Sequence, residues 1–274
     1  STQAKTLFPY TTLFRSVLKV DRKLQERLFK EIQESLDNEL NYQVEAQNLA
    51  VARAFHEKLD SKIVIPKVFP EYSSRHVLTL SFEQGESIET ASAWPLEVRN
   101  ALGRRLFRAM GQEIFYLKRF HCDPHPGNFA FREDGTVIIY DFGGVKTLSS
   151  EIVHHFKQLI HASRERNVAE IEDQLDALHA LAEKGKFPAG LYQQWLDVLM
   201  RPLTTHYDFA ENSAHHDGVE LVKASLKYWD VFKPSPDTLM VNRTVSGHYW
   251  NMIHLKVHDD LSDVFEELVP PRSA

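Results

Sequence analysis

One stretch, HCDPHPGNFAFREDGTVIIYDFGG from His121 to Gly144, constrains the fold of this chain more than any other part of the sequence. Two short runs rich in apolar residues, 129–132 and 136–140, flank an Asp-Gly pair, and this pattern is typical of a β-hairpin. A hairpin returns the chain beside its own start, with neighbouring strands about 4.8 Å apart. We therefore expect Asn128, before the first strand, and Asp141, after the second, to face one small volume.

An amide and a carboxylate held in this way can bind magnesium. Mg²⁺ prefers oxygen ligands at about 2.1 Å and commonly takes one or two protein side chains, while phosphate and water oxygens fill its other positions. Asp123 precedes Asn128 by five residues in a loop stiffened by Pro124 and Pro126. Its carboxylate can accept or orient the proton of an attacking hydroxyl during phosphoryl transfer. Each residue alone is a common turn former, but their joint spacing predicts Asp123, Asn128 and Asp141 as catalytic residues, with Asn128 and Asp141 as the metal ligands.

Composition excludes several other classes of protein. The 274 residues include 32 Lys and Arg against 38 Asp and Glu, a net charge of −6, so we expect no nucleic-acid partner. Cys122 is the single cysteine, which excludes an intramolecular disulfide. The longest run without charged residues, 244–255, is too short for a membrane-spanning helix, which needs roughly 18 residues. We expect a cytoplasmic protein, with peripheral association at a membrane left open.

The first sixteen residues look foreign to the rest of the chain. LFPYTTLFRS, from Leu7 to Ser16, is identical to the in-frame translation of a widely used sequencing adapter. The alternative is an ordinary apolar strand, because its aromatic residues alternate along the segment. We expect residues 1–16 to be non-native, and we leave them out of the fold prediction.

The remaining sequence is mainly helical. Apolar residues recur at helical spacing over 21–59, as one long helix or two, over 96–120, and over most of the chain after residue 148. Short strands are predicted at 63–65 and 76–82, which are rich in β-branched and aromatic residues. With the hairpin, these elements predict an α+β fold. We divide the chain into residues 1–16, 17–80 and 81–274.

The motifs resemble those of a known family. The order D-x-x-x-x-N followed by DFG is similar to the phosphotransfer core of protein-kinase-like enzymes. HCDPHPGN at 121–128, with NELNYQVEAQN at 38–48, resembles the UbiB (AarF) family of atypical kinase-like proteins, whose members carry HxDPHPGN and an ELDYxxEAxN helix. The resemblance implies a protein-kinase-like α+β fold, with a mostly helical C-lobe at 81–274 and an incomplete N-lobe at 17–80. The implied cofactors are ATP and Mg²⁺. The implied activity is phosphoryl transfer or ATP hydrolysis linked to isoprenoid quinone (ubiquinone) biosynthesis or lipid homeostasis, with a nucleotide and a quinone precursor or lipid as partners.

The same resemblance assigns residues to roles. Asp123 corresponds to the catalytic-loop aspartate, and Glu39 to the helix glutamate that pairs with a nucleotide-binding lysine. Glu45 matches the glutamate of the family's EA pair. The resemblance thus places Glu39, Asn41, Glu45 and Gly143 at the cofactor.

Three features depart from the family pattern. Asn41 stands where the family has an aspartate, and Ser81 occupies a hinge position where an acidic residue is usual. The KxGQ helix, the alanine-rich loop and a convincing strand lysine are not found, since Lys19 is interpreted as an exposed residue at a helix entry. We expect this chain to bind metal and triphosphate weakly and to show no magnesium-dependent ATP hydrolysis above background. Clear turnover that Asp141→Ala abolishes would contradict this expectation.

Two other classes stay open at this point. One is a small-molecule phosphotransferase of the aminoglycoside or choline kinase type, whose catalytic loops contain similar strings, although the ELNYQVEAQN segment argues against it. The other is a pseudokinase that acts as a lipid-binding scaffold, which Asn41 and Ser81 favour. The intact set of Asp123, Asn128 and Asp141 argues against the scaffold.

The fourteen histidines do not form a metal-binding pattern. The adjacent pairs, 154–155 and 215–216, point in different directions on a helix and lack cysteine partners, so a structural zinc site is not expected. His121 and His125 flank the proposed catalytic aspartate, and we expect them to brace the loop by hydrogen bonds.

Overall fold

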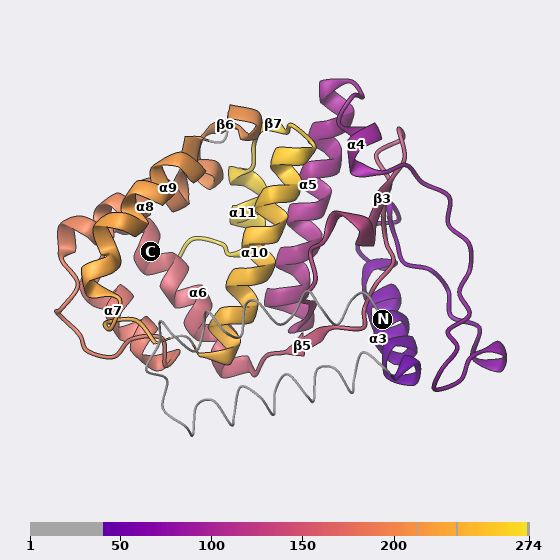
Figure 1. The fold of residues 1–274 in the computed structure, drawn as a ribbon, viewed down its shortest axis with the longest axis horizontal. Coiled ribbons are helices and arrows are strands. Elements are labelled where there is room, and N and C mark those ends of the chain that lie inside the picture. Colours follow the sequence, from indigo (N-terminus) through magenta and orange to yellow (C-terminus); the bar gives the residue numbers. More distant parts are fainter. Residues whose placement is uncertain (1–40, 212, 234, 273–274) are drawn as a thin grey trace, which may run out of the picture.

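The structure, a computed structural model, describes residues 41–211, 213–233 and 235–272. A small sheet and helix α3 lie at one end of the molecule, α5 and α10 run through its middle, and α6 to α9 form the other end (Figure 1). The predictions for residues 1–16, Lys19 and Glu39 lie outside the described residues.

The first described helix is shorter than the predicted one. α3 (Tyr42–His56) begins where the side chain of Asn41 accepts a hydrogen bond from Gln43 N at 3.2 Å. Such a cap satisfies a backbone donor that has no partner inside the helix, so it sets the helix start at this point. One continuous helix over 21–59 is therefore excluded, and two helices remain compatible with the sequence pattern.

The predicted strand at 63–65 is present and the one at 76–82 is not. β1 (Ile63–Val64) is followed by a 3₁₀ turn, η2 (Pro70–Tyr72). Within 76–82, only Leu80 pairs, in an isolated bridge to Val68. Leu78 and Leu80 are partly buried against the core, but Val77 and Phe82 are exposed to 55% and 89%, so the run lacks the continuous buried face that would stabilise a strand.

The predicted hairpin is confirmed. β3 (Phe129–Phe131) pairs antiparallel with β4 (Val137–Ile139), and β1 lies parallel to β4 on its other side. Gly135 makes the turn with φ +84°, a conformation that favours glycine. Every residue of β3 and β4 is buried, so the hairpin lies within the core, and its turn fixes the register.

The central helix leads, through a turn and a short strand, into the loop that contains Asp123, the predicted catalytic loop. α4 (Ile88–Ala91) precedes α5 (Leu96–Gln112), which continues into a π-helical turn, η3 (Glu113–Leu117). The helix predicted over 96–120 therefore ends early, because Lys118 has φ 57° and the chain enters strand β2 (Arg119–His121). β2 pairs with β5 (Val145–Thr147), and the loop between β2 and the hairpin contains a 3₁₀ turn, η4 (Pro126–Asn128).

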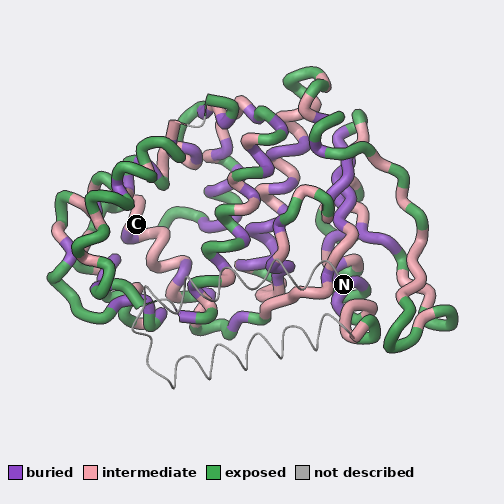
Figure 2. The backbone as a smooth tube through the Cα atoms, viewed as in Figure 1, coloured by how far each residue is buried: buried purple, intermediate pink, exposed green. Residues whose placement is uncertain are grey.

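The rest of the described chain is mostly helical. Its elements are α6 (Ser150–Arg164), α7 (Val168–Ala177), α8 (Ala189–Thr204), β6 (His206–Asp208), η5 (Phe209–Glu211), α9 (Ser213–Ser225), η6 (Leu226–Tyr228), α10 (Pro236–His254), β7 (His258–Asp260) and α11 (Ser262–Leu268). Buried residues gather around α5 and along the small sheet (Figure 2). Among the helices of the described residues, none combines the length and apolar character that spanning a membrane requires.

Candidate functional site

The hairpin brings Asn128 and Asp141 to the same end of two paired strands. Tyr140 N donates to Asn128 O at 3.0 Å, and Phe129 pairs with Ile139. Asp141 is the next residue after Tyr140, so the two predicted ligands are neighbours across the strand ends. This adjacency is the one that the sequence pattern predicts.

Asp123 is joined to Asn128 within the loop. Asn128 Nδ2 donates to the carbonyl oxygen of Asp123 at 2.9 Å and to its carboxylate Oδ2 at 3.1 Å. These bonds leave the carboxamide oxygen of Asn128 as the atom able to ligate a cation. The other carboxylate oxygen of Asp123, Oδ1, lies 3.4 Å from Arg243 Nη2 on α10. Arg243 was not among the predicted site residues.

The two histidines beside Asp123 differ in what they do. His125 Nδ1 accepts a hydrogen bond from Gly127 N at 3.0 Å, so His125 braces the loop as predicted. The prediction is wrong for His121, because neither of its buried ring nitrogens has a hydrogen-bond partner within the described residues. Its ring instead packs against Phe129 and Phe142, with centroids 5.7 Å apart in both pairs. Burial lowers the pKa of His121, which keeps the ring uncharged.

The DFG segment turns tightly at Asp141. Asp141 Oδ1 accepts a hydrogen bond from Gly143 N at 2.7 Å. A Cβ atom on Gly143 would lie 3.2 Å from Asp141 Oδ1 and 3.7 Å from Glu45 Oε2. Gly143 thus sits beside both carboxylates, and its lack of a side chain keeps the space near them open.

Two side chains of α3 hold the backbone of Phe142. The carboxylate of Glu45 accepts a hydrogen bond from the Phe142 backbone, and Asn48 Nδ2 donates to Phe142 O at 2.9 Å. Arg119 Nη2 on β2 donates in turn to Asn48 Oδ1 at 2.7 Å. Glu45 and Asn48 are three residues apart and therefore share one helix face. Asn48 and Arg119 were not predicted, although the last residue of the EAQN string offered a signal for Asn48.

Glu45 and Asp141 form an acidic pair that fits a hard divalent cation. Burial, and then the nearby charge of Asp141, raise the pKa of Glu45 from 4.5 to about 7, while the hydrogen bond from Phe142 opposes the rise. The carboxylates together with the amide oxygen of Asn128 make an all-oxygen donor set, as Mg²⁺ prefers. Within the described ranges, no cluster of three or more His, Cys, Asp or Glu side chains could hold a metal ion. The site therefore fits an ion that is completed by phosphate and water oxygens.

We expect the free energy of unfolding of the metal-free protein to fall as the pH rises from about 5 to about 8, in part through Glu45. Its pKa is about 7 in the folded protein and near 4.5 in the unfolded chain. Between these values the folded state binds more protons, so the contribution is present at low pH and is lost as the pH rises through the folded pKa. Glu45→Gln should flatten this slope, as measured by urea denaturation in EDTA. The exposed control Glu57→Gln should keep it, and an unchanged slope in Glu45→Gln would contradict the assignment.

The remaining predicted cofactor residues lie at the edge of the site or beyond the described chain. Asn41 is the N-cap of α3, one turn before Glu45, so its side-chain oxygen is engaged with its own helix. Ser81 Oγ accepts from Lys67 N at 2.9 Å and donates to Glu83 Oε1 at 3.1 Å. Glu39 lies outside the described residues.

A buried carboxylate connects α3 to the catalytic loop. Glu113, in the π-helical turn after α5, accepts a hydrogen bond from His121 N at 3.1 Å and contacts His56 Nε2 of α3 at 3.0 Å. All three residues are buried. Single π-helical turns are frequent at functional sites, and here the turn places the carboxylate between two elements that shape the site.

Helix α10 forms the support below the loop. Asn251 Nδ2 donates to Pro124 O at 3.0 Å. A Cβ atom on Gly247 would lie only 2.0 Å from Pro124 Cγ, so α10 approaches the loop as closely as a glycine allows. α10 therefore contacts the loop at Pro124 and also supplies Arg243.

Comparisons with known proteins identify a family and relatives of this chain. A family model described as the ABC1 atypical kinase-like domain matches residues 5–175. An ABC1 family protein of Schizosaccharomyces pombe is 30% identical over 155 residues, which cover 53% of this chain and 29% of that protein. The mitochondrial atypical kinase COQ8B of Danio rerio is 28% identical over 156 residues, covering 54% of this chain and 24% of that protein. This chain thus spans less than a third of the length of these relatives.

A solved structure has a similar fold. The complex of Rv3197 with erythromycin, from Mycobacterium tuberculosis, matches with a TM-score of 0.65 at 21% sequence identity. The match covers 94% of this chain and 64% of that chain. It extends the structural similarity across the C-terminal helices, beyond the residues that the family model matches.

Proposed function

Because the chain belongs to the ABC1 atypical kinase-like family, we propose that its site binds magnesium and ATP through Asp123, Asn128 and Asp141, the residues for phosphoryl transfer or ATP hydrolysis in the whole protein. For this chain by itself we still expect no ATP hydrolysis above background. The family and the kinase-like α+β fold expected from the sequence are confirmed. The single observation that carries the proposal is the convergence of these three residues. Asn128 is hydrogen-bonded to Asp123, and Asp141 follows the residue that pairs with Asn128.

Each residue has a distinct role in this proposal. The amide oxygen of Asn128 and the carboxylate of Asp141 hold the cation, which when bound supplies positive charge to the phosphate oxygens. Asp123 accepts or orients the proton of the attacking hydroxyl or water. Glu45 and Asn48 hold the Phe142 backbone and so fix the position of Asp141.

The biological setting is proposed on family membership. We infer a link to isoprenoid quinone biosynthesis or lipid homeostasis, with a quinone precursor or lipid as the further partner. Relatives are described as mitochondrial in zebrafish and chloroplastic in Arabidopsis. For this chain we propose a cytoplasmic location with peripheral association at a membrane.

Calorimetric titration with ADP and with a non-hydrolysable ATP analogue tests the proposed site. We expect saturable binding of both nucleotides in magnesium and loss of at least tenfold in affinity when EDTA removes the ion, because phosphates bind through the metal. Potassium chloride at matched ionic strength controls for screening. Binding of equal strength without magnesium, or no binding at all, would contradict the proposal.

A further inference from the structure

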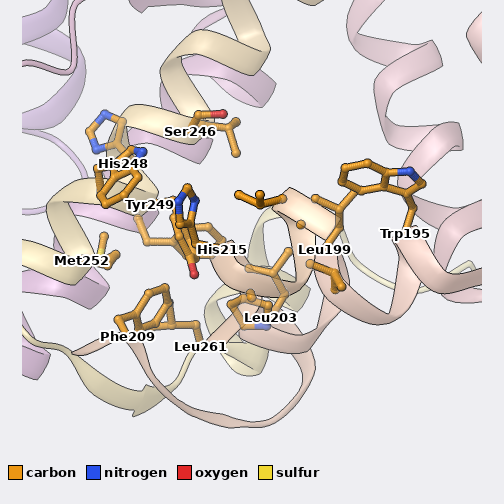
Figure 3. A pocket seen from close by; sticks show the side chains of 18 of the residues that line it. Trp195, Leu199, Leu203, Phe209, His215, Ser246, His248, Tyr249, Met252 and Leu261 are labelled. Carbon is orange, nitrogen blue, oxygen red and sulfur yellow. The ribbon is translucent and has the colours of Figure 1, made fainter. Parts of the chain in front are cut away.

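A hollow lies between the C-terminal helices, away from the candidate site. A cavity of about 570 Å³ opens between α8, α9 and α10 (Figure 3). Its inner wall includes the buried side chains of Phe209, Met252 and Leu261, and its rim includes the exposed side chains of Leu199 and Val222. In Figure 3, Leu199, Leu203, Phe209 and Leu261 gather around the cavity, and Trp195 stands at one end.

Three polar side chains of the wall are already engaged within the protein. Trp195 Nε1 donates to Ser225 Oγ at 3.1 Å, and Tyr249 Oη lies 3.3 Å from Tyr207 Oη. Lys223 at the rim is ion-paired with Glu220 at 2.6 Å. A charged ligand would lose its hydration here without gaining a free partner of opposite sign, and that loss is costly.

His248 adds an uncharged polar group to this wall, and its buried Nδ1 has no hydrogen-bond partner among the described residues. Its ring lies 5.5 Å from that of Phe129, on the side of α10 that faces the hairpin. Burial lowers the pKa of His248 to about 3, so the ring is uncharged at neutral pH. The surface offered to a ligand is thus almost entirely hydrocarbon and aromatic carbon.

We propose that this cavity binds an uncharged, hydrocarbon-rich small molecule. Its volume lies within the range of about 300–1,000 Å³ that is typical of small-molecule pockets. Buried side chains close the inner end of the cavity. A small molecule that fills the cavity removes apolar surface from water, which favours binding.

The proposal goes beyond the phosphotransfer site and does not rest on it. The cavity uses the face of α10 that carries Val245 and Tyr249, whereas Arg243 and Asn251 of the same helix contact the catalytic loop. Apolar ligand binding can therefore be measured in a protein with or without nucleotide.

Glycine substitutions give a matched test. Gly218 of α9 lines the cavity, and no heavy atom lies within 4 Å of its Cβ position, so Gly218→Phe adds a bulky side chain at the cavity wall whose Cβ meets no clash. Gly190 of α8 has the same open surroundings and does not line the cavity, which makes Gly190→Phe the control. Both substitutions replace a glycine, which has the lowest helix propensity of any residue except proline. Neither substitution is therefore expected to weaken its helix.

The probe is N-phenyl-1-naphthylamine, an uncharged dye whose emission rises in apolar surroundings. We expect the unsubstituted chain and Gly190→Phe to bind one dye saturably, with energy transfer from Trp195 and Trp250 of the cavity wall. Gly218→Phe should weaken binding at least tenfold. A second variant, Val222→Glu, adds a carboxylate at an exposed rim position and should weaken binding similarly.

Three results would overturn the proposal. The first is that Gly218→Phe and Val222→Glu bind the dye as tightly as the unsubstituted chain does. The second is that Gly190→Phe loses as much dye affinity as Gly218→Phe. The third is that the unsubstituted chain shows no saturable dye binding. If Gly218→Phe does not fold, as judged by circular dichroism, Val222→Glu decides, because its side chain is 49% exposed in the unsubstituted protein.

Discussion

Asp141→Asn is expected to lower the affinity for magnesium nucleotide by about 100-fold, which corresponds to roughly 3 kcal/mol. Asparagine keeps the oxygen that accepts the hydrogen bond of Gly143 N, so the turn after β4 is retained. The substitution removes the negative charge that a divalent cation needs from this position. Calorimetric titration with magnesium and the ATP analogue measures the loss.

The same variant has a second expected effect of opposite sign. The charge of Asp141 contributes to the raised pKa of Glu45, so removing that charge lowers the pKa of Glu45 toward 4.5. The metal-free variant should then be more stable than the unsubstituted protein at pH 8, as urea denaturation in EDTA would show. A merely unfolded variant would lose stability together with nucleotide affinity.

Asp123→Asn is the matched control for Asp141→Asn. Asp123 lies in the same loop system, but in the proposal it handles the proton and does not bind the metal. Its variant should keep magnesium-dependent binding within about threefold, a change of less than 1 kcal/mol. Nucleotide binding by Asp141→Asn as tight as that of Asp123→Asn would show that the hairpin pair is not the metal site.

Gly247→Ala is expected to destabilise the protein by about 1–3 kcal/mol, although alanine is the better helix former. Alanine in a helix interior gains about 1 kcal/mol over glycine. Here the added Cβ would lie 2.0 Å from Pro124 Cγ and 2.6 Å from Pro124 Cβ, so α10 and the catalytic loop must separate. That movement also strains the buried hydrogen bond from Asn251 to Pro124 O. Urea denaturation measures the change.

Gly218→Ala provides the comparison for this helix substitution. No heavy atom lies within 4 Å of the Cβ position of residue 218, so Gly218→Ala should stabilise the protein by up to about 1 kcal/mol. Magnesium nucleotide should also bind more weakly to Gly247→Ala, because Pro124 and Asn128 belong to one loop. If the two alanine variants were equally stable, α10 would not support the loop as described.

The sequence predicted the hairpin and the buried face of α5 correctly, but it predicted a strand at 76–82 that does not form. The hairpin needed only the Asp-Gly turn between two apolar runs, and the buried face of α5 followed from the spacing of Leu102, Leu106 and Ala109. The strand predicted at 76–82 is absent because β propensity reflects packing on a half-buried surface, and here only Leu78 and Leu80 pack against the core while Phe82 is exposed.

By itself, the sequence determined which residues meet when the chain folds back within a few residues. Asn128 and Asp141 meet because a two-strand hairpin joins them, and alternation and turn chemistry are legible in single segments. The tertiary structure alone decided the partners of that site. Arg243 reaches Asp123 across 120 residues, Asn251 reaches Pro124 across 127, and His56 meets Glu113 across 57. Such contacts depend on how whole helices pack, and periodicity specifies only that a helix face is buried, without specifying the partner that covers it.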